Sequence, residues 1–329
     1  MSTKKFFYIT IFVLIAMAFV FPFAMASEVD YIYLGGMPVG ITMDSPGLLI
    51  CGKTEVITQE GAVIPSLDLE IIPGDYLVNI NGTDVDSLQD IIDVLDNVKA
   101  GEKVKLGIKR GKNTCCFELM PALDVLTKKL KLGLTIQEDL NGVGTLTYCT
   151  KDGKIGALGH AISGDGVKLQ TGKLYECKIV GLKLPRNGAA GELQGVFDKN
   201  SVPIAVIKQN NDYGIFGEGT TKLKNLPQVK RGNRNQVKEG KAYVYTCIGG
   251  DSVEKYEIEI VKAYRQNRKS TKSMVISVTD VRLLEKTGGI LQGMSGSPIV
   301  QDGKLIGAVT HVFTQDATKG YGIYLDWML

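Results

Sequence analysis

The chain has 329 residues, of which 44% are hydrophobic and 22% charged, and its formal net charge is +3. The length suits two or three domains of ordinary globular composition. So small a net charge, with no motif of interleaved basic and aromatic side chains, gives no reason to expect nucleic acid as a partner. The 39 glycines and the many Val, Ile and Thr residues favour a turn-rich β-protein.

The first 26 residues have the pattern of a targeting segment. Two lysines precede an apolar run over residues 6–23, and small residues follow at positions 24–26. This pattern predicts a signal peptide, and the run is also nearly long enough to remain as an uncleaved membrane anchor. Either alternative predicts export of the remaining chain.

Residues 30–121 are predicted to form one α+β unit. The turn signal Pro-Gly-Asp at 73–75 and the hairpin signal Asn-Gly at 81–82 flank a segment of alternating polarity. The predicted elements are strands over 39–43, 47–51, 76–80 and 104–110, and a helix over 88–95 that Asp86 or Ser87 caps.

This order of elements and the segment 72–82 resemble a PDZ domain of the protease-associated type. PDZ domains bind an extended peptide as an added strand, and their backbone amides hold its terminal carboxylate. The resemblance implies that the binding loop contains Val39, Gly40 and Ile41. The alternative is a small domain that only packs on its neighbour.

Residues 122–329 are predicted to form a β-domain that begins with a partly charged connector at 122–131. Short strands alternate with Gly, Asn and Asp turns, and helical periodicity is rare, which favours a barrel or sandwich. The six cysteines of the chain include no Cys-x-x-Cys pair, which argues against a zinc site.

Only two histidines, His160 and His311, are available as a general base. Histidine suits that role because its ordinary pKa lies near working pH. His160 follows small residues that would let a strand end approach other backbone closely. The alternative is a structural histidine at position 160, with His311 as the second candidate base.

The segment Gly293-Met294-Ser295-Gly296-Ser297-Pro298 could present a serine nucleophile on a sharp turn. It resembles the Gly-Asp-Ser-Gly-Gly-Pro motif of chymotrypsin-like proteases. That resemblance implies a nucleophile at Ser295 and an oxyanion hole formed by the N–H groups of Gly293 and Ser295. Ser297 is the second candidate nucleophile, although the proline after it restricts its backbone. The other interpretation is a turn that merely precedes a strand.

The order of His160 before Ser295 is that of chymotrypsin-like enzymes. Local pattern does not fix the third member of a triad. Asp280 ends an apolar strand pattern, where a carboxylate could hold an imidazole in one tautomer. The candidate acids between or near the pair are Asp152, Asp165, Asp198, Asp251 and Asp280.

The PDZ-like unit, the segments 159–162 and 288–299, and Asp280 together resemble the SpoIVB peptidases, signalling serine peptidases of endospore-forming bacteria. The resemblance covers nearly all of the chain after residue 26. It implies a chymotrypsin-like β-barrel peptidase domain after the PDZ-like domain. It also implies that Ser295, His160 and Asp280 are the catalytic residues, with no metal or cofactor required.

The resemblance further implies a function. Such an endopeptidase cleaves itself near its N-terminus and cleaves a membrane-embedded regulator of an intramembrane protease, in the space between the two membranes of the forespore. That cleavage triggers processing of a sigma factor. The alternatives are a catalytically inert PDZ adaptor and a general protease for misfolded exported proteins.

Overall fold

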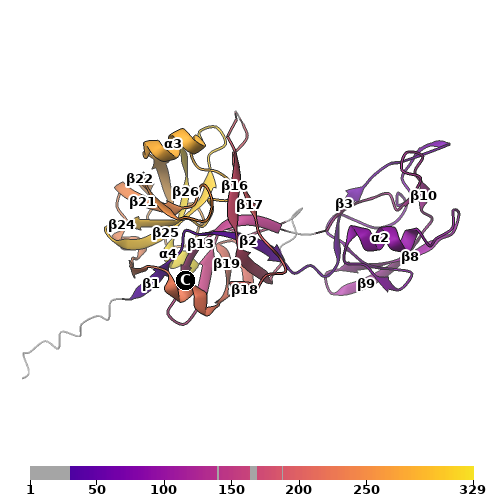
Figure 1. Ribbon diagram of the computed structural model, residues 1–329, viewed down its shortest axis with the longest axis horizontal. Coiled ribbons are helices and arrows are strands. Elements are labelled where there is room, and N and C mark those ends of the chain that lie inside the picture. The colour runs from indigo at the N-terminus through magenta and orange to yellow at the C-terminus, as the bar shows by residue number, and fades with distance from the viewer. Residues whose placement is uncertain (1–29, 139–140, 164–168, 187) are drawn as a thin grey trace, which may run out of the picture. The chain divides into compact units, whose positions relative to one another are not determined.

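The computed structural model describes residues 30–138, 141–163, 169–186 and 188–329 (Figure 1). The predicted signal or anchor segment at 1–26 lies outside these residues. Within them, no helix has both the length and the apolar character needed to cross a bilayer.

A 14-stranded sheet contains two barrels of six strands each. The first barrel consists of β2 (Pro38–Met43), β13 (Asn141–Cys149), β14 (Lys154–Ala157), β15 (Gly172–Glu176), β18 (Ala205–Asn211) and β19 (Gly214–Gly219). The second consists of β21 (Gly240–Thr246), β22 (Glu254–Ala263), β23 (Met274–Val278), β24 (Pro298–Gln301), β25 (Lys304–Val312) and β26 (Lys319–Tyr324).

Extra pairings close both barrels. β13 pairs with β14 to complete the first, and β25 pairs with β26 to complete the second. Two linking strands, β1 (Tyr31–Leu34) and β20 (Gln228–Arg231), connect β13 to β25. Closure leaves no unpaired sheet edge in either ring of strands.

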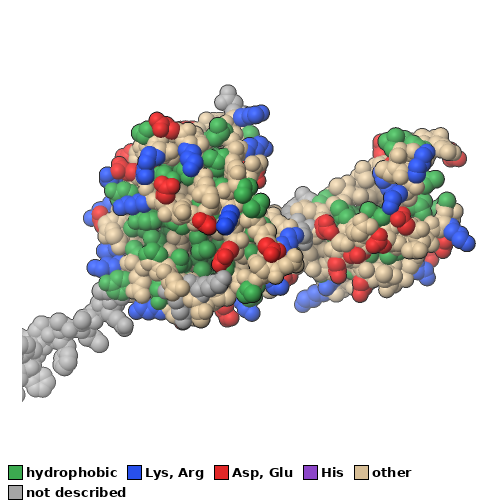
Figure 2. All heavy atoms as spheres, in the orientation of Figure 1, with side chains coloured by type: hydrophobic (Ala, Val, Ile, Leu, Met, Phe, Trp, Pro, Cys, Tyr) green, Lys and Arg blue, Asp and Glu red, His purple; other side chains and the backbone are tan. Residues whose placement is uncertain are grey.

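Each barrel encloses its own apolar core, as alternation along half-buried strands requires. Buried side chains of the first core include Ile41, Leu146, Ile155, Leu174 and Ile207. Those of the second include Val244, Ile258, Ile276, Ile299 and Ile323. Burying one such side chain contributes about 1.5–3 kcal/mol. Outside the cores, basic and acidic side chains are intermixed over the visible face (Figure 2), in keeping with the small net charge.

A second sheet and one helix form the PDZ-like domain (Figure 1). Its strands are β3 (Leu48–Lys53), β6 (Tyr76–Ile80), β7 (Thr83–Asp84), β8 (Val104–Arg110), β9 (Asn113–Leu119) and β12 (Leu134–Gln137). Helix α2 (Leu88–Leu95) starts at Ser87, whose hydroxyl accepts from the N–H of Asp90. The carboxylate of Asp90 accepts in turn from the N–H of Ser87, so the cap is reciprocal. Ile91 and Leu95 then face the domain core.

The remaining elements are short. They are helices α3 (Val281–Thr287) and α4 (Leu325–Met328), 3-10 turns over Thr221–Asn225 and Arg234–Gln236, and hairpins of β4 (Val56–Thr58) with β5 (Gly61–Val63), β10 (Ala122–Leu123) with β11 (Leu130–Lys131), and β16 (Lys178–Lys183) with β17 (Glu192–Val196).

The predicted fold class is confirmed: mainly β, with a PDZ-like α+β domain and a chymotrypsin-like barrel domain. The predicted boundaries of the PDZ-like domain are wrong. Residues 31–43 supply β1 and β2 to the large sheet, and β12 belongs to the PDZ-like sheet. The PDZ-like domain is therefore an insertion, over residues 48–137, between two strands of the first barrel.

The predicted peptide-binding loop is wrong for the same reason. Val39, Gly40 and Ile41 lie in β2, which pairs with β13 along one edge and with β15 along the other. A carboxylate-binding loop needs unpaired N–H groups, whereas both edges of β2 are occupied. Gly40 is needed for packing, because a Cβ atom there would lie 2.1 Å from the ring of Phe197.

Candidate active site

His160 and Ser295 line one cleft of about 380 Å³, to which both barrels contribute. His160 lies three residues after the end of β14 in the first barrel, and Ser295 lies three residues before the start of β24 in the second. Closing two separate barrels thus brings together the predicted base and nucleophile. Apolar lining comes from Val143, Leu158, Ile162, Ile290 and Leu291.

The two residues before His160 have left-handed backbone conformations and form a turn. Leu158 has φ 68° and Gly159 has φ 72°. A side chain at position 159 would lie 2.8 Å from the Cγ2 atom of Thr310, so the turn requires glycine. A buried leucine in this conformation is strained, and such strain persists where the surroundings hold it.

The amide of Asn210 fixes the segment after His160. Its Oδ1 accepts from the N–H of Ile162 at 3.0 Å, and its Nδ2 donates to the carbonyl of Ile162 at 2.6 Å. Nδ2 also donates to the carbonyl of Leu169 at 2.8 Å. This buried amide ties the end of β18 to the loop that carries the histidine.

The serine lies on a turn that the first barrel clamps. Gly293 and Gly296 have φ values of 94° and 93°. The hydroxyl of Thr145 donates to the carbonyl of Gly293 at 2.9 Å, and its N–H donates to the carbonyl of Ser295 at 3.0 Å. The hydroxyl of Thr147 donates to the carbonyl of Gly296 at 2.7 Å. Strand β13 therefore holds the nucleophile turn of the second barrel through three hydrogen bonds.

The backbone amides of Gly293 and Ser295 have no hydrogen-bond acceptor among the described residues. Their neighbours do: the N–H of Met294 donates to the carbonyl of Leu291, and that of Gly296 to the carbonyl of Val309. Gly293 and Ser295 both border the cleft. Two unpaired amides beside a serine hydroxyl are what an oxyanion hole requires.

The hydroxyl of Ser295 is bonded to a backbone carbonyl and not to His160. Its Oγ donates to the carbonyl of Thr310 at 2.7 Å, and no hydrogen bond joins it to His160 in the described part of the chain. The Nδ1 atom of His160 lies 2.8 Å from the carbonyl oxygen of Ala161. Catalytic hydrogen bonds often tighten only when substrate is bound, so this arrangement is compatible with a serine–histidine pair.

Both histidines are neutral at pH 7. Burial lowers the pKa of His160 below its ordinary value, although the contact with the Ala161 carbonyl opposes the shift. Desolvation, together with the nearby His160 and Lys272, lowers the pKa of His311 to about 4. The two rings lie 5.0 Å apart, so His311 also borders the site. A neutral imidazole can accept a proton, which is the state that a general base needs.

The structure does not bring Asp280 to His160. The carboxylate accepts from the N–H of Arg282 at 3.0 Å, from the guanidinium of Arg282, and from the N–H of Glu257 at 3.1 Å. Asp280 is the N-cap of α3, and hydrogen bonding to Arg282 lowers its pKa to about 2. No hydrogen bond joins Asp280 to His160 among the described residues. Its predicted role in the triad thus finds no support in the geometry.

Replacing Asp280 with alanine is expected to lower the free energy of unfolding by about 1–2 kcal/mol, because the helix loses its cap. Folding lowers the pKa of this carboxyl group. The carboxylate therefore stabilises the folded protein above the unfolded pKa of about 4, and this stabilisation is lost as the pH falls towards 2. Urea unfolding at pH 7 and pH 3 would measure both effects. An equal loss at the two pH values would contradict this account.

The other candidates are engaged elsewhere. Asp152 bonds the hydroxyl of Thr150 and the ammonium of Lys154, and Asp251 pairs with Lys178. Asp198 accepts from the N–H of Asn200, and Asp165 lies outside the described residues. Ser297 is fully buried, and its Oγ donates to the hydroxyl of Thr246 at 2.9 Å, which removes it as a nucleophile.

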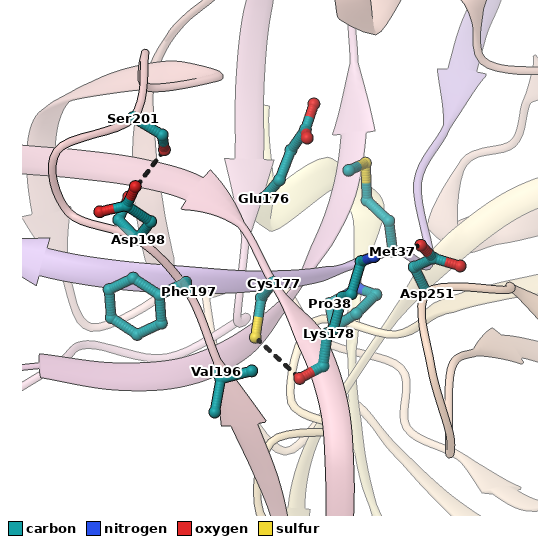
Figure 3. Close-up of a pocket in the computed structure, with 10 residues that line it drawn as sticks. All are labelled: Met37, Pro38, Glu176, Cys177, Lys178, Val196, Phe197, Asp198, Ser201 and Asp251. Carbon is teal, nitrogen blue, oxygen red and sulfur yellow. Dashed lines mark hydrogen bonds and ion pairs between the residues drawn. The ribbon is translucent and has the colours of Figure 1, made fainter.

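A larger cavity of about 530 Å³ contains the thiol of Cys177 (Figure 3). Burial raises the pKa of this thiol to about 11, so it remains protonated. The residues around it are Met37, Pro38, Glu176, Lys178, Val196, Phe197, Asp198, Ser201 and Asp251, none of which is a histidine. A protonated thiol without a base is a poor nucleophile, so this cavity is a weaker candidate for the active site than the cleft of Ser295.

The PDZ-like domain has an apolar groove away from the predicted loop. About 350 Å³ of space lies between α2 and β12, which is the end strand of its sheet. Leu88, Ile91, Ile92, Leu134 and Ile136 line it. Addition of a peptide strand needs a terminal strand beside a groove, and this is where the domain has both.

The sequence model of SpoIVB peptidase S55 matches residues 128–329, more than half of the chain. No curated protein sequence matches the chain significantly.

Among solved structures, the PDZ domain of the SdrC-like protein from Listeria monocytogenes is 22% identical, covering 28% of this chain and 90% of that one, with a TM-score of 0.23. The active form of the Rv3671c protease from M. tuberculosis is 15% identical, covering 56% and 70%, with a TM-score of 0.33. The HtrA-type protease AlgW with decapeptide is 12% identical, covering 66% and 52%, with a TM-score of 0.33.

Proposed function

Because the chain belongs to the SpoIVB peptidase S55 family and is a serine peptidase, we propose that Ser295 is its nucleophile and His160 its general base. One observation carries this assignment: the amides of Gly293 and Ser295 have no acceptor within the described part of the chain. They lie beside a serine hydroxyl in a cleft that also contains a neutral imidazole.

The mechanism follows from these positions. The hydroxyl of Ser295 leaves the carbonyl of Thr310, gives its proton to His160 and attacks the peptide carbonyl. The two free amides stabilise the resulting oxyanion, and the protonated imidazole then gives its proton to the leaving amine. Water hydrolyses the acyl-enzyme by the reverse roles. Once the serine has turned, the carbonyl of Thr310 is free to accept an N–H group of the substrate backbone.

We also propose which proteins this peptidase cleaves. The chain would cleave itself near its N-terminus and then a membrane-associated regulator of an intramembrane protease during spore formation, outside the cytoplasm. The family and the apolar pattern of residues 6–23 support this proposal. The groove between α2 and β12 would hold the target. A general protease for misfolded proteins would instead digest casein broadly, whereas a signalling protease would cut few sites.

The test uses purified 27–329 chain as wild type, Ser295→Ala and Ser297→Ala. Wild type is expected to trim its N-terminal region and to take up a fluorophosphonate on Ser295, both followed by mass spectrometry. Ser295→Ala should lose both reactions by at least 10³-fold. Ser297→Ala should keep both, because its hydroxyl serves only the buried bond to Thr246.

Absence of label on Ser295 in wild type would favour the inert adaptor. Equal trimming of wild type and Ser295→Ala would mean that another nucleophile, or a contaminant, does the cutting.

A further inference from the structure

Asp212 lies in the turn of a hairpin that belongs to the same barrel as His160. The turn joins β18 to β19, and β19 pairs with β14, the strand that leads to the histidine. A cavity of about 470 Å³ is lined by Asp212 together with His160, Ala161, Tyr213 and His311. His160 and His311 also line the cleft of Ser295, so this cavity adjoins the reaction site.

Both ends of the turn are fixed to the segment that carries the histidine. Before the turn, the amide of Asn210 bonds both backbone groups of Ile162. After it, Gly214 approaches so closely that a side chain there would lie 2.7 Å from the carbonyl oxygen of Ala157 and 3.3 Å from the amide of Gly159. The position of Asp212 relative to His160 is therefore set by buried contacts, although its own side chain is exposed.

Few carboxylates lie near enough to His160 to orient its imidazole. His311 faces it across 5.0 Å, and Lys272 acts on His311. Asp212 supplies the carboxylate in the lining of the two cavities that contain His160. Asp280 is absent from both linings, and its oxygens already accept from Arg282 and Glu257.

We propose that Asp212, rather than Asp280, is the positioning residue that orients His160 during catalysis, an inference that rests on His160 being the base. Rotation of the imidazole would move its Nδ1–H from the carbonyl of Ala161 to the carboxylate of Asp212. The Nε2 atom then faces the hydroxyl of Ser295 and takes its proton. The carboxylate holds the reactive tautomer and stabilises the imidazolium.

The experiment compares wild type, Asp212→Asn, Asp212→Glu and Asp280→Ala in the 27–329 chain. The substrate is a peptide spanning the bond at which mass spectrometry finds the wild-type chain trimmed, and kcat and KM are measured from pH 5 to pH 9. Asp212→Asn is expected to lower kcat by about 10²–10⁴-fold, the upper figure being the loss seen for the acid of another serine triad. KM should change less than threefold, since the role proposed for Asp212 is to orient His160 and not to bind substrate.

A pH readout separates positioning from a structural role. Without the carboxylate the imidazolium is less stable, so the acid limb of the kcat profile in Asp212→Asn should move to lower pH. The kcat of Asp212→Glu should exceed that of Asp212→Asn by at least tenfold. Asp280→Ala should keep the wild-type kcat per folded molecule and the wild-type acid limb.

Three results would overturn the proposal: an unchanged kcat in Asp212→Asn, a lowered kcat with neither a moved acid limb nor rescue by glutamate, or a moved limb in Asp280→Ala alone. Failure of the proposed function has a different signature, because activity would then survive in Ser295→Ala or His160→Gln.

Discussion

Substitution of His160 by glutamine is expected to lower kcat by about 10⁶-fold, the loss seen when the base of a serine triad is removed. Glutamine keeps a polar side chain of similar reach but cannot accept the serine proton. His160 is half-buried, and among the described residues its ring bonds only the carbonyl of Ala161, so the variant should fold normally. Peptide hydrolysis measures the loss, and far-ultraviolet circular dichroism checks the fold.

His311→Gln is the matched control, because its ring lies 5.0 Å from that of His160 in the same cleft. Its activity should stay within about tenfold of wild type. If His311→Gln abolished hydrolysis and His160→Gln did not, His311 would be the base.

The lowered pKa of His160 also predicts how peptidase activity depends on pH. The base must be neutral, and it is neutral above its folded pKa. Burial lowers that pKa, so activity persists below pH 6.5 and is lost as pH falls through the lowered value. His311, with a pKa of about 4, protonates lower still, so its removal should leave the acid limb nearly in place. An acid limb above pH 6.5 would contradict this reading of the site.

Features that depend on neighbouring residues, such as turns and helix caps, could be predicted from the sequence. The glycines around Ser295 predicted a sharp turn, and both adopt the left-handed backbone that the turn requires. Ser87 was one of two predicted caps of the helix at 88–95, and the reciprocal bonds with Asp90 select it. The predicted barrel class was confirmed because alternating apolar residues with frequent turns suit few other architectures.

Long-range pairing could not be predicted from such signals. The apolar segment at 39–43 fits a strand of either sheet, and only its pairing with β13 and β15 assigns it to the barrel. An aspartate between a strand and a helix has the same local pattern whether it caps the helix or holds a catalytic imidazole. Asp280 caps the helix. Asp212 lies in an ordinary-looking Asn-Asp-Tyr-Gly turn, and its proximity to His160 comes from barrel closure.

The contacts of the threonines that clamp the nucleophile turn could not be predicted from local sequence either. Thr145 and Thr147 alternate along an ordinary strand pattern, and nothing in their neighbourhood of the sequence indicates that they bond Gly293, Ser295 and Gly296. Their function depends on the packing of one barrel against the turn of the other. A site assembled in this way should be sensitive to any substitution that separates the turn from β13.

Gly296→Ala is such a substitution, and it is expected to lower the free energy of unfolding by roughly 2–6 kcal/mol. A Cβ atom at position 296 would lie 2.1 Å from the carbonyl oxygen of Thr145 and 2.5 Å from the amide nitrogen of Leu158. Both are backbone atoms that cannot move aside cheaply. Backbone strain at φ 93° and overpacking each cost about 1–3 kcal/mol, which gives the total.

Activity should fall with stability, because the clash displaces Ser295 from its amides and from His160. A displacement of about 1 Å can cost about 10²-fold in rate, so fluorophosphonate labelling of the folded fraction should slow by at least that factor. Gly303→Ala is the matched control: its φ is also left-handed, at 71°, but no atom lies within 4 Å of the added carbon.

That control should lose only about 1 kcal/mol from strain and keep the wild-type labelling rate. If Gly296→Ala behaved like Gly303→Ala in urea unfolding and labelling, the contact between β13 and the nucleophile turn would not be rigid. Alignment of Ser295 would then have to come from the bound substrate, and the clamp by Thr145 and Thr147 would have no catalytic consequence.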